Sequence, residues 1–246
     1  MFIHYRTIGL VLKKEDRGEA DQLFTIYTKD YGTLEIFGRA IRKISSKLRA
    51  GADIFYLSEI EFIQGKTKKT LTDAILIEKF RNLRKSLGRL AVAYKISEIF
   101  TALVKHPEPE EKIWELLVKT FKRLDASYKL EVISYNKIYY YFFWNLIKIL
   151  GYQPEFYRCS ICQKKLSPEK IYFNQKGGEI ICQKCYNTKR TKNDWREINS
   201  NTIKILRVIV EKDWPFFKKI KINKELQREL GEISEDYFLC LKKSFS

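Results

Sequence analysis

Short segments rich in β-branched and aromatic residues alternate with turn signals from Phe2 to about Phe80. Residues of these types fit the pleated, half-buried surface of a sheet, so the segments predict strands. Tyr31-Gly32 and Gln64-Gly65 are turn signals between them. Because a sheet this small leaves edges exposed unless it closes, we expect residues 1–80 to form a β-barrel of the OB-fold type. The predicted strands are Thr7–Leu12, Gln22–Thr28, Thr33–Arg39, Ile54–Ile63 and Leu71–Phe80.

Beyond Arg81 the apolar residues recur at intervals of three and four, which is the stripe of a helix that packs on a core. His106-Pro107-Glu108-Pro109 predicts a break between the first two helices. Three more helices are expected at about 130–150, 201–212 and 223–243. We therefore predict an α-helical domain over residues 81–246. The first two stripes are Leu83, Leu87, Leu90, Ala91 and Tyr94, and then Ile113, Trp114, Leu117 and Phe121.

The most apolar run, Ile138 to Leu150, is interrupted by Asn145 and Lys148. It is also shorter than the roughly 18 to 20 residues that a bilayer span needs. We interpret it as a buried core helix that ends at Gly151. The first residues carry no secretory signal pattern, so a cytoplasmic location without a membrane partner is expected.

Four of the five cysteines form two Cys-x-x-Cys pairs, Cys159/Cys162 and Cys182/Cys185, separated by nineteen residues. Two such pairs supply four thiolates for a tetrahedral zinc site. Apolar segments on both sides of Lys176-Gly177-Gly178 predict a hairpin that connects the pairs. The predicted fold class is therefore α+β: an OB-fold barrel, then a helical domain with a four-cysteine zinc ribbon inserted at 156–188.

Four cysteine ligands close the coordination of one zinc ion, so the predicted metal is structural and not catalytic. A pair of redox dithiols is the alternative, but nothing like a thioredoxin strand and helix surrounds either pair. Cys240 lies on an apolar helical face and is interpreted as a small buried hydrophobic residue.

The formal net charge is +17, from 47 Lys and Arg residues against 30 Asp and Glu residues. This balance favours polyanionic partners, either nucleic acid or an acidic membrane. Lysine enrichment from codon usage or heat adaptation is the alternative.

The loop from Gly38 to Gly51, GRAIRKISSKLRAG, holds five positive side chains and no negative one. Strand alternation places Leu34 and Ile36 inside the barrel and Phe37 and Arg39 outside. An exposed ring beside a cation suits single-stranded nucleic acid, because the ring stacks on a base while the cation meets phosphate.

Three basic clusters are therefore candidate nucleic-acid contacts, with simple solvated loops as the alternative. The third cluster precedes and enters the first helix, where its spacing places several members on one helical side. The candidates are Phe37, Arg39, Arg42, Lys43, Lys47 and Arg49 around the loop, Lys66, Lys68 and Lys69 at a second tip, and Arg81, Arg84 and Lys85.

No catalytic residue is predicted. His4 and His106 are the only histidines, and neither has the setting of a general base. No phosphate-binding glycine loop of the G-x-x-x-x-G-K-[ST] type occurs. A small acidic group near the second strand consists of Asp16, Glu19 and Asp21. We interpret these residues as stabilising a turn, with the metal site of a nuclease as the alternative.

The order of these parts resembles the RecO family of bacterial DNA repair proteins over nearly the whole chain. The resemblance rests on TIGLVLK, on GEADQLFTIYTKDYG, on SKLRA from Ser46 to Ala50, on LTDA from Leu71 to Ala74, and on LGYQPEFYRCSIC from Leu150 to Cys162. One departure is Gly51 to Phe55, where the family usually has a Leu-x-Pro-Phe-like segment. Some members lack the cysteines, which implies that the metal does not carry the function.

The resemblance implies a DNA repair and recombination mediator that binds single- and double-stranded DNA, anneals complementary strands and helps load recombinase. It implies two protein partners: a RecR-like protein and the C-terminal tail of the single-stranded DNA-binding protein. We expect the tail to dock on the helical domain, where Lys122 or Arg123 could meet its carboxylates. The implied location is the bacterial cytoplasm, at the nucleoid. An RNA- or ribosome-associated protein with the same two modules stays the alternative.

Overall fold

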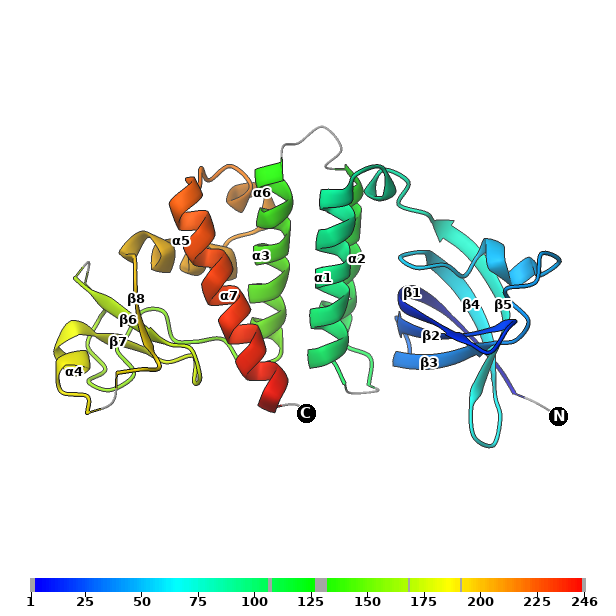
Figure 1. Ribbon diagram of the computed structural model, residues 1–246, viewed down its shortest axis with the longest axis horizontal. Helices are drawn as coiled ribbons and strands as arrows, with labels where there is room; N and C mark the ends of the chain where they lie inside the picture. The colour runs from blue at the N-terminus through cyan, green and yellow to red at the C-terminus, as the bar shows by residue number, and fades with distance from the viewer. Residues whose placement is uncertain (1–2, 106–107, 127–131, 168, 191, 245–246) are drawn as a thin grey trace. The chain divides into compact units, whose positions relative to one another are not determined.

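The computed structural model describes residues 3–105, 108–126, 132–167, 169–190 and 192–244 (Figure 1). The chain divides into two compact units, Met1–Leu130 and Glu131–Ser246, which are described separately. The first unit extends past the barrel to residue 130, and the domain boundary expected near residue 80 stays a prediction.

The first unit begins with a closed barrel of five strands in the order β1-β2-β3-β5-β4. Only the β3–β5 pair is parallel. This is the strand arrangement of the OB-fold, so the predicted fold of the N-terminal part is confirmed. The strands are β1 (His4–Arg17), β2 (Asp21–Thr28), β3 (Gly32–Gly38), β4 (Leu57–Gln64) and β5 (Lys69–Glu78).

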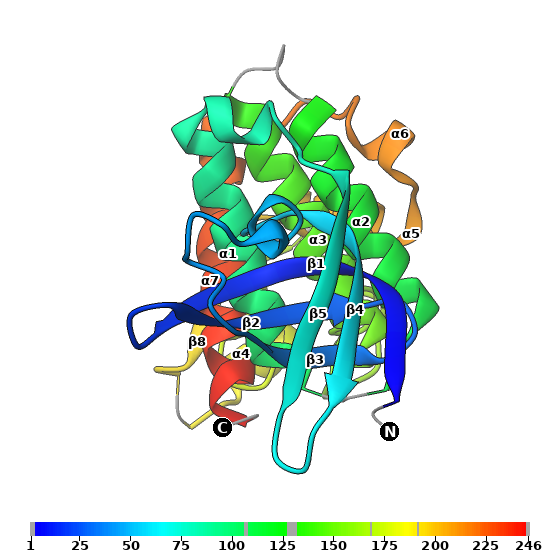
Figure 2. The same ribbon diagram turned by 90° about the vertical axis from the view of Figure 1, so that its right-hand side faces the viewer.

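Strand β1 closes the barrel because it pairs on both sides. Its first half, from His4 to Leu10, pairs with β4, and its second half, from Gly9 to Arg17, pairs with β2. A bulge between Val11 and Lys13 lies in the second half. Figure 2 shows β1 as a long, curved strand of the barrel. Strand β1 is therefore longer at both ends than the predicted Thr7–Leu12.

The barrel interior is filled by alternate residues of the strands, as the pattern predicts. On β3, Leu34 and Ile36 are buried, Glu35 is exposed and Phe37 is half-buried. Strand β4 begins three residues later than expected, after Phe55, whose φ of 58° is outside the range of a regular strand. The main buried residues of the barrel are Val11, Phe24, Ile26, Leu34, Ile36, Ile60, Phe62 and Leu71.

Two helices, α1 (Leu87–Leu103) and α2 (Glu111–Ala126), complete the first unit. Tyr27 of β2 meets Phe100 with ring centroids 4.7 Å apart and Trp114 at 6.2 Å. These aromatic contacts fix the helices against the barrel strands. The helices are separated where the His-Pro-Glu-Pro segment lies, although His106 and Pro107 themselves are outside the described residues.

The apolar stripe predicted for the first helix was wrong. Leu87 is 87% exposed and Tyr94 50% exposed, while Ala93, Ile96 and Phe100 are buried. The reason is local: Ser86 caps α1 by accepting a hydrogen bond from the Arg89 amide, so the helix begins after Leu83 and not before it. Leu83 is buried in a separate 3₁₀ turn, η2 (Leu83–Lys85).

The second unit is built on α3 (Val132–Ile149), which packs against α5 (Ser200–Glu211) and α7 (Lys224–Ser244). Trp144 of α3 is fully buried, and its indole N–H donates to Ser234 Oγ at 3.0 Å. The apolar run is thus a buried core helix, as expected. Among the described residues, no helix has both the length and the apolar character needed to span a bilayer. A short helix, α6 (Trp214–Phe217), lies between α5 and α7 in sequence.

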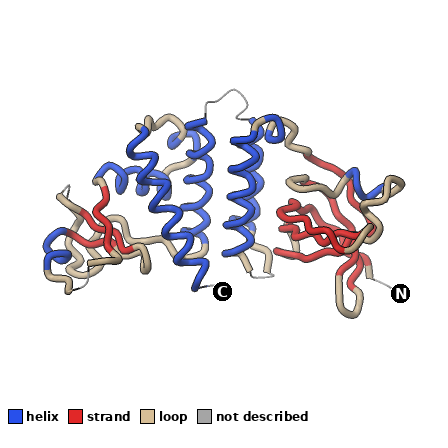
Figure 3. Tube along the Cα trace, viewed as in Figure 1, coloured by secondary structure: helices blue, strands red, loops and turns tan. Residues whose placement is uncertain are grey.

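A small ribbon is inserted between α3 and α5, visible in Figure 3 as a second group of strands. Its sheet has the antiparallel order β7-β6-β8. The hairpin between β6 and β7 was predicted, whereas β8 was not. The elements of the ribbon are β6 (Ile171–Asn174), β7 (Ile180–Cys182), α4 (Gln183–Asn187) and β8 (Trp195–Ile198).

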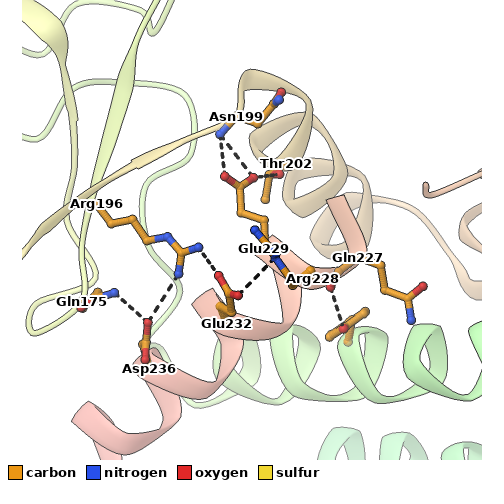
Figure 4. Close-up of polar contacts among 10 residues, drawn as sticks. Gln175, Arg196, Asn199, Thr202, Gln227, Arg228, Glu229, Glu232 and Asp236 are labelled. Atoms are coloured by element: carbon orange, nitrogen blue, oxygen red, sulfur yellow. Dashed lines mark hydrogen bonds and ion pairs between the residues drawn. The ribbon is translucent and has the colours of Figure 1, made fainter. Parts of the chain in front are cut away.

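Polar side chains of α7 hold the ribbon sheet (Figure 4). Arg196 of β8 pairs with Glu232 and lies 3.9 Å from Asp236, which also accepts from Gln175 at 2.7 Å. Glu229 accepts from the Asn199 amide at 3.1 Å, at the junction of β8 and α5. The ribbon is thus fixed to the helices of its own unit by charge-assisted hydrogen bonds.

Candidate nucleic-acid interface and metal centre

The basic loop, Gly38 to Gly51, is anchored to the barrel at both ends. At its start, the Ala40 amide donates to Asp21 Oδ1 at 2.7 Å and the Arg42 amide donates to the Ala20 carbonyl at 3.0 Å. At its end, a Cβ on Gly51 would lie 1.9 Å from the carbonyl oxygen of Ala74. Only glycine permits this close approach of two backbones.

Apolar side chains within the basic loop turn its cations outward. Ile41 is 1% exposed, and Leu48 packs against the barrel core from the 3₁₀ turn η1 (Lys47–Ala50). With these two side chains inside, the charged side chains between and beside them lie at the surface. The exposed cations are Arg39, Arg42, Lys43, Lys47 and Arg49.

A cavity of about 760 Å³, here called the loop cavity, lies between the basic loop and the barrel. Its cations come from three places in the sequence: Arg42 and Arg49 from the loop, Lys14 from β1, and Lys79 from the end of β5. Asp53 is the only carboxylate among its lining residues. The remaining lining residues are Gln22, Ile41, Ser46, Ala50, Ala52 and Tyr56.

Asp53 offsets only part of this positive charge. Burial acts to raise its pKa, but hydrogen bonds from Lys14 at 2.5 Å and from the Ile54 amide outweigh burial, so the pKa lies below its usual value. Among the lining residues, an ionised Asp53 against four cations leaves a net charge of about +3. Asp16, which pairs with Arg42 from outside the lining, lowers this to about +2. An opening with this charge attracts phosphate groups.

The second basic tip, with Lys66, Lys68 and Lys69, lies beside Phe37. A joint role of these residues in nucleic-acid binding requires this proximity. Strand β5 pairs with β3 at Ile36–Lys69 and Phe37–Thr70, and this pairing brings the β4–β5 hairpin to the end of β3. Lys68 Nζ lies 4.3 Å from the centre of the Phe37 ring. Lys66 and Lys68 are exposed and Lys69 is half-buried.

The third cluster is not on one side of a helix, because α1 begins only at Leu87. Arg84 is half-buried, donates to the Ile54 carbonyl and lies 5.0 Å over the Tyr56 ring, so it fixes the floor beside the loop cavity. Arg81 and Lys85 are exposed.

The acidic group near β2 makes contacts within the turn and the basic loop. Asp16 pairs with Arg42 at 3.4 Å and accepts from Gln22, while Asp21 accepts from the Ala40 amide. Across the described ranges, the one set of three or more His, Cys, Asp or Glu side chains placed to bind a metal is a set of four cysteines. Asp16, Glu19 and Asp21 therefore do not form a metal site in this structure.

The predicted meeting of Cys159, Cys162, Cys182 and Cys185 is confirmed: all four Sγ atoms lie within 4.8 Å of one another. Cys162 and Cys182 Sγ are 3.9 Å apart, close to the edge of about 3.8 Å that a tetrahedron with metal–sulfur bonds of ~2.3 Å requires. The residues present thus fit a tetrahedral thiolate site for one metal ion.

The local fold turns the thiols toward one point. Gln163 has a φ of 59°, and its amide donates to the Cys159 carbonyl, which bends the chain around the first pair. Burial acts to raise the pKa of Cys159, but amide N–H groups of Cys162, Cys182 and Ile161 lower it to about 6. Burial and neighbouring thiols raise the pKa of Cys185 to about 12.

Cys240 is apart from this set and is not fully buried, contrary to the interpretation from sequence. It is half-buried on α7, and its thiol donates to the Lys176 carbonyl in the β6–β7 turn. The prediction failed because the turn, which is distant in sequence, offers a polar partner to this helical face.

Lys14 and Tyr56, which line the loop cavity, were not among the predicted contacts. Lys14 stands in β1, where the sequence gives no reason to connect it with the loop. The +17 net charge was the only signal, and it does not assign positions.

Comparison with known proteins agrees with this architecture. Residues 1–80 match the family model for the Recombination protein O N terminal domain, and residues 84–241 match the model for its C terminal domain. The DNA repair protein RecO of a Dehalococcoides mccartyi strain is 34% identical over 230 residues, which is 92% of this chain and 86% of the relative.

Two further relatives carry the same name. The protein from Moorella thermoacetica is 30% identical over 232 residues, covering 93% of this chain and 83% of the relative. The protein from Thermodesulfovibrio yellowstonii is 29% identical over 244 residues, which is 97% of this chain and 94% of the relative. The chain belongs to the RecO family of DNA repair proteins.

Proposed function

We propose that this protein binds single- and double-stranded DNA on its barrel, anneals complementary strands and helps load recombinase. The observation that carries the proposal is the loop cavity, where four cations and one carboxylate meet beside the exposed basic loop. Family membership supports the same role in DNA repair. Such work is done on chromosomal DNA, so we propose the nucleoid as its location.

Annealing follows from charge neutralisation. Two complementary single strands repel each other, and cations that replace the counterions of both backbones lower that barrier. Phe37 and the Lys68 ammonium above its ring add a stacking position. A phosphate that draws Lys68 away would expose the ring to a base.

The metal in this proposal is a single structural zinc ion. Four cysteines leave no open position for water or substrate, so the metal would stabilise the ribbon and take no part in chemistry. No catalytic step is proposed for the protein.

Two protein partners are proposed from family membership: a RecR-like protein and the acidic C-terminal tail of the single-stranded DNA-binding protein. Lys122 is exposed and Arg123 half-buried on α2, and the exposed Lys122 ammonium can meet carboxylates of the tail. A pull-down with the intact tail, and with a tail lacking its last residues, tests this contact. Equal retention of both would count against it.

The DNA site is tested by charge reversal in the basic loop. We expect Arg42→Glu, Lys47→Glu and Arg49→Glu together to weaken single-strand binding at ~150 mM salt by about tenfold or more. The slope of log affinity against log salt should fall by about 2, because three phosphate contacts are lost at roughly 0.7 each. Fluorescence anisotropy across a salt series measures both.

The matched control reverses three exposed lysines elsewhere in the same unit: Lys29→Glu, Lys112→Glu and Lys119→Glu. It carries the same change in net charge, so a general loss of attraction would weaken both variants equally. Equal loss in both would refute the loop cavity as the DNA site. Competition between matched DNA and RNA strands tests the alternative partner.

A further inference from the structure

The second cysteine pair of the ribbon continues into a strongly basic segment. Residues 183–190 and 192–193, here called the basic knuckle, contain Lys184, Lys189, Arg190 and Lys192 and no acidic residue. Lys184, Arg190 and Lys192 are exposed, and Lys189 is half-buried. The segment includes α4, whose Cys185 is one of the four clustered cysteines.

The two acidic residues that follow the basic knuckle most closely in sequence are engaged elsewhere. Asp194 pairs with Lys176 of the β6–β7 turn at 2.8 Å. Glu197 pairs with Lys170 at 3.0 Å. Within the described part of the chain, none of the four knuckle cations forms an ion pair with a carboxylate. The charge of the knuckle is therefore uncompensated.

Aromatic rings lie directly beneath these cations. Lys192 Nζ lies 4.9 Å from the centre of the Tyr186 ring, and Lys189 Nζ lies 5.1 Å from that of Trp195. The other face of Tyr186 stacks on Tyr172, with centroids 3.6 Å apart and planes inclined by 3°. Tyr186 and Trp195 are half-buried, so the packed rings form a platform over which Lys192 and Lys189 lie.

This arrangement repeats the one on the barrel, where Lys68 covers Phe37. A carboxylate-rich peptide would need the cations but would have no use for the rings. A single strand of nucleic acid uses both, because phosphates attract the lysines and bases stack on the uncovered rings. Stacking of one base on an aromatic ring contributes about 1–3 kcal/mol.

We propose that the basic knuckle is a second binding surface for single-stranded nucleic acid, on the unit that does not contain the barrel. Its strand contacts are Lys184, Arg190 and Lys192, with Tyr186 and Trp195 as stacking rings. One protein molecule then holds two strands at once, which deepens the annealing function proposed above and rests on it for its biological use. The role of the four cysteines in this proposal is to fix the platform.

The test uses the full-length, metal-loaded protein and the variant Lys184→Glu, Arg190→Glu, Lys192→Glu. Two non-complementary single strands, one with a donor and one with an acceptor fluorophore, report by energy transfer when one protein holds both. We expect the variant to lose most of this transfer and to anneal complementary strands at least fivefold more slowly. The control Lys219→Glu, Lys221→Glu, Lys224→Glu changes the same charge at exposed positions of the same unit.

A second readout locates the strand without any substitution. Strands containing 5-iododeoxyuridine cross-link to aromatic residues on which the base stacks, and we expect cross-linked peptides that contain Tyr186 or Trp195. The absorption spectrum of the cobalt-substituted protein reports an intact thiolate site. If the charge-reversed variant fails to bind cobalt, the milder Lys184→Gln, Arg190→Gln, Lys192→Gln variant replaces it.

The outcomes separate this inference from the proposed barrel site. If the knuckle variant matches its control and no knuckle peptide cross-links, the inference is overturned while the barrel site stands. If the barrel variant matches its control but the knuckle variant loses binding, the barrel site fails and the inference stands. Loss of acidic-peptide binding by the knuckle variant, with strand binding unchanged, would also overturn it.

Discussion

At the scale of single residues, Glu61 of β4 shows how the barrel depends on pH. Hydrogen bonds from His4 at 2.7 Å and from Arg6 at 2.9 Å lower the pKa of this carboxyl group from 4.5 to about 2. A depressed folded-state pKa stabilises the fold above the unfolded-state pKa of 4.5, and this stabilisation is lost as the pH falls toward 2.

We therefore expect Glu61→Gln to flatten the dependence of stability on pH between about 4.5 and 2. Urea unfolding at pH 7 and at pH 3 measures it: the difference between the two midpoints should be smaller in the variant than in the wild type. Glu35→Gln, at an exposed position of β3, is the control. A wild-type difference retained in full by Glu61→Gln would contradict this account.

Gly51 is the residue on which the position of the basic loop depends most directly. We expect Gly51→Ala to destabilise the protein by about 1–3 kcal/mol, because a Cβ 1.9 Å from the Ala74 carbonyl oxygen forces the backbones apart. Strand binding should weaken as well, since Arg49 moves with the loop. Urea unfolding measures the change in stability, and fluorescence anisotropy measures the change in strand affinity.

The matched substitution is Gly177→Ala, where the nearest atom to a new Cβ would lie at an ordinary 3.6 Å. It should leave both stability and strand binding close to wild type. Equal stability of the two variants would show that the contact between Gly51 and Ala74 is not restrictive.

At the scale of elements, sequence patterns succeeded where they reflect a local rule. Alternation on β3 correctly placed Leu34 and Ile36 inside the barrel, and cysteine spacing correctly brought four thiols together. The same kind of rule failed for α1, because three residues separate its true start at Leu87 from the apolar Leu83. A periodic stripe does not reveal where a helix begins, whereas the Ser86 cap does.

Elements that depend on distant partners were not predictable in this way. Strand β8 has only four residues, and its pairing with β6 joins segments more than twenty residues apart in sequence. The loop cavity likewise combines Lys14, Arg49 and Lys79, which only the closed barrel brings together. The sequence predicted the basic loop but not its counterpart on the barrel surface.

At the scale of the whole molecule, the two units separate the four-cysteine cluster from the barrel. All four clustered cysteines lie in Glu131–Ser246, and the loop cavity lies in Met1–Leu130. Removal of the metal should therefore unfold the ribbon while the barrel keeps its structure. Structural metal sites of this kind contribute directly to folding.

We expect a strong chelator to abolish hydrogen-exchange protection in β6 and β7 and to leave protection in β1 to β5 unchanged. Cys162→Ser should reproduce the effect of the chelator, whereas Cys240→Ser, outside the cluster, should not. Loss of protection in the barrel on chelation would show that the two units do not fold independently.

The double pairing of β1 also determines when the barrel can form during synthesis. Strand β2, its neighbour on one side, and β3, which pairs with β2, end by residue 38, so these three strands can assemble as soon as that length has emerged. Its other edge has to wait for β4, because His4 pairs with Ile63. Contacts of such long sequence separation slow folding, since the chain between them must first be ordered. A ribosome translating this protein at ~5–20 residues per second thus exposes an open sheet edge for seconds before the barrel closes.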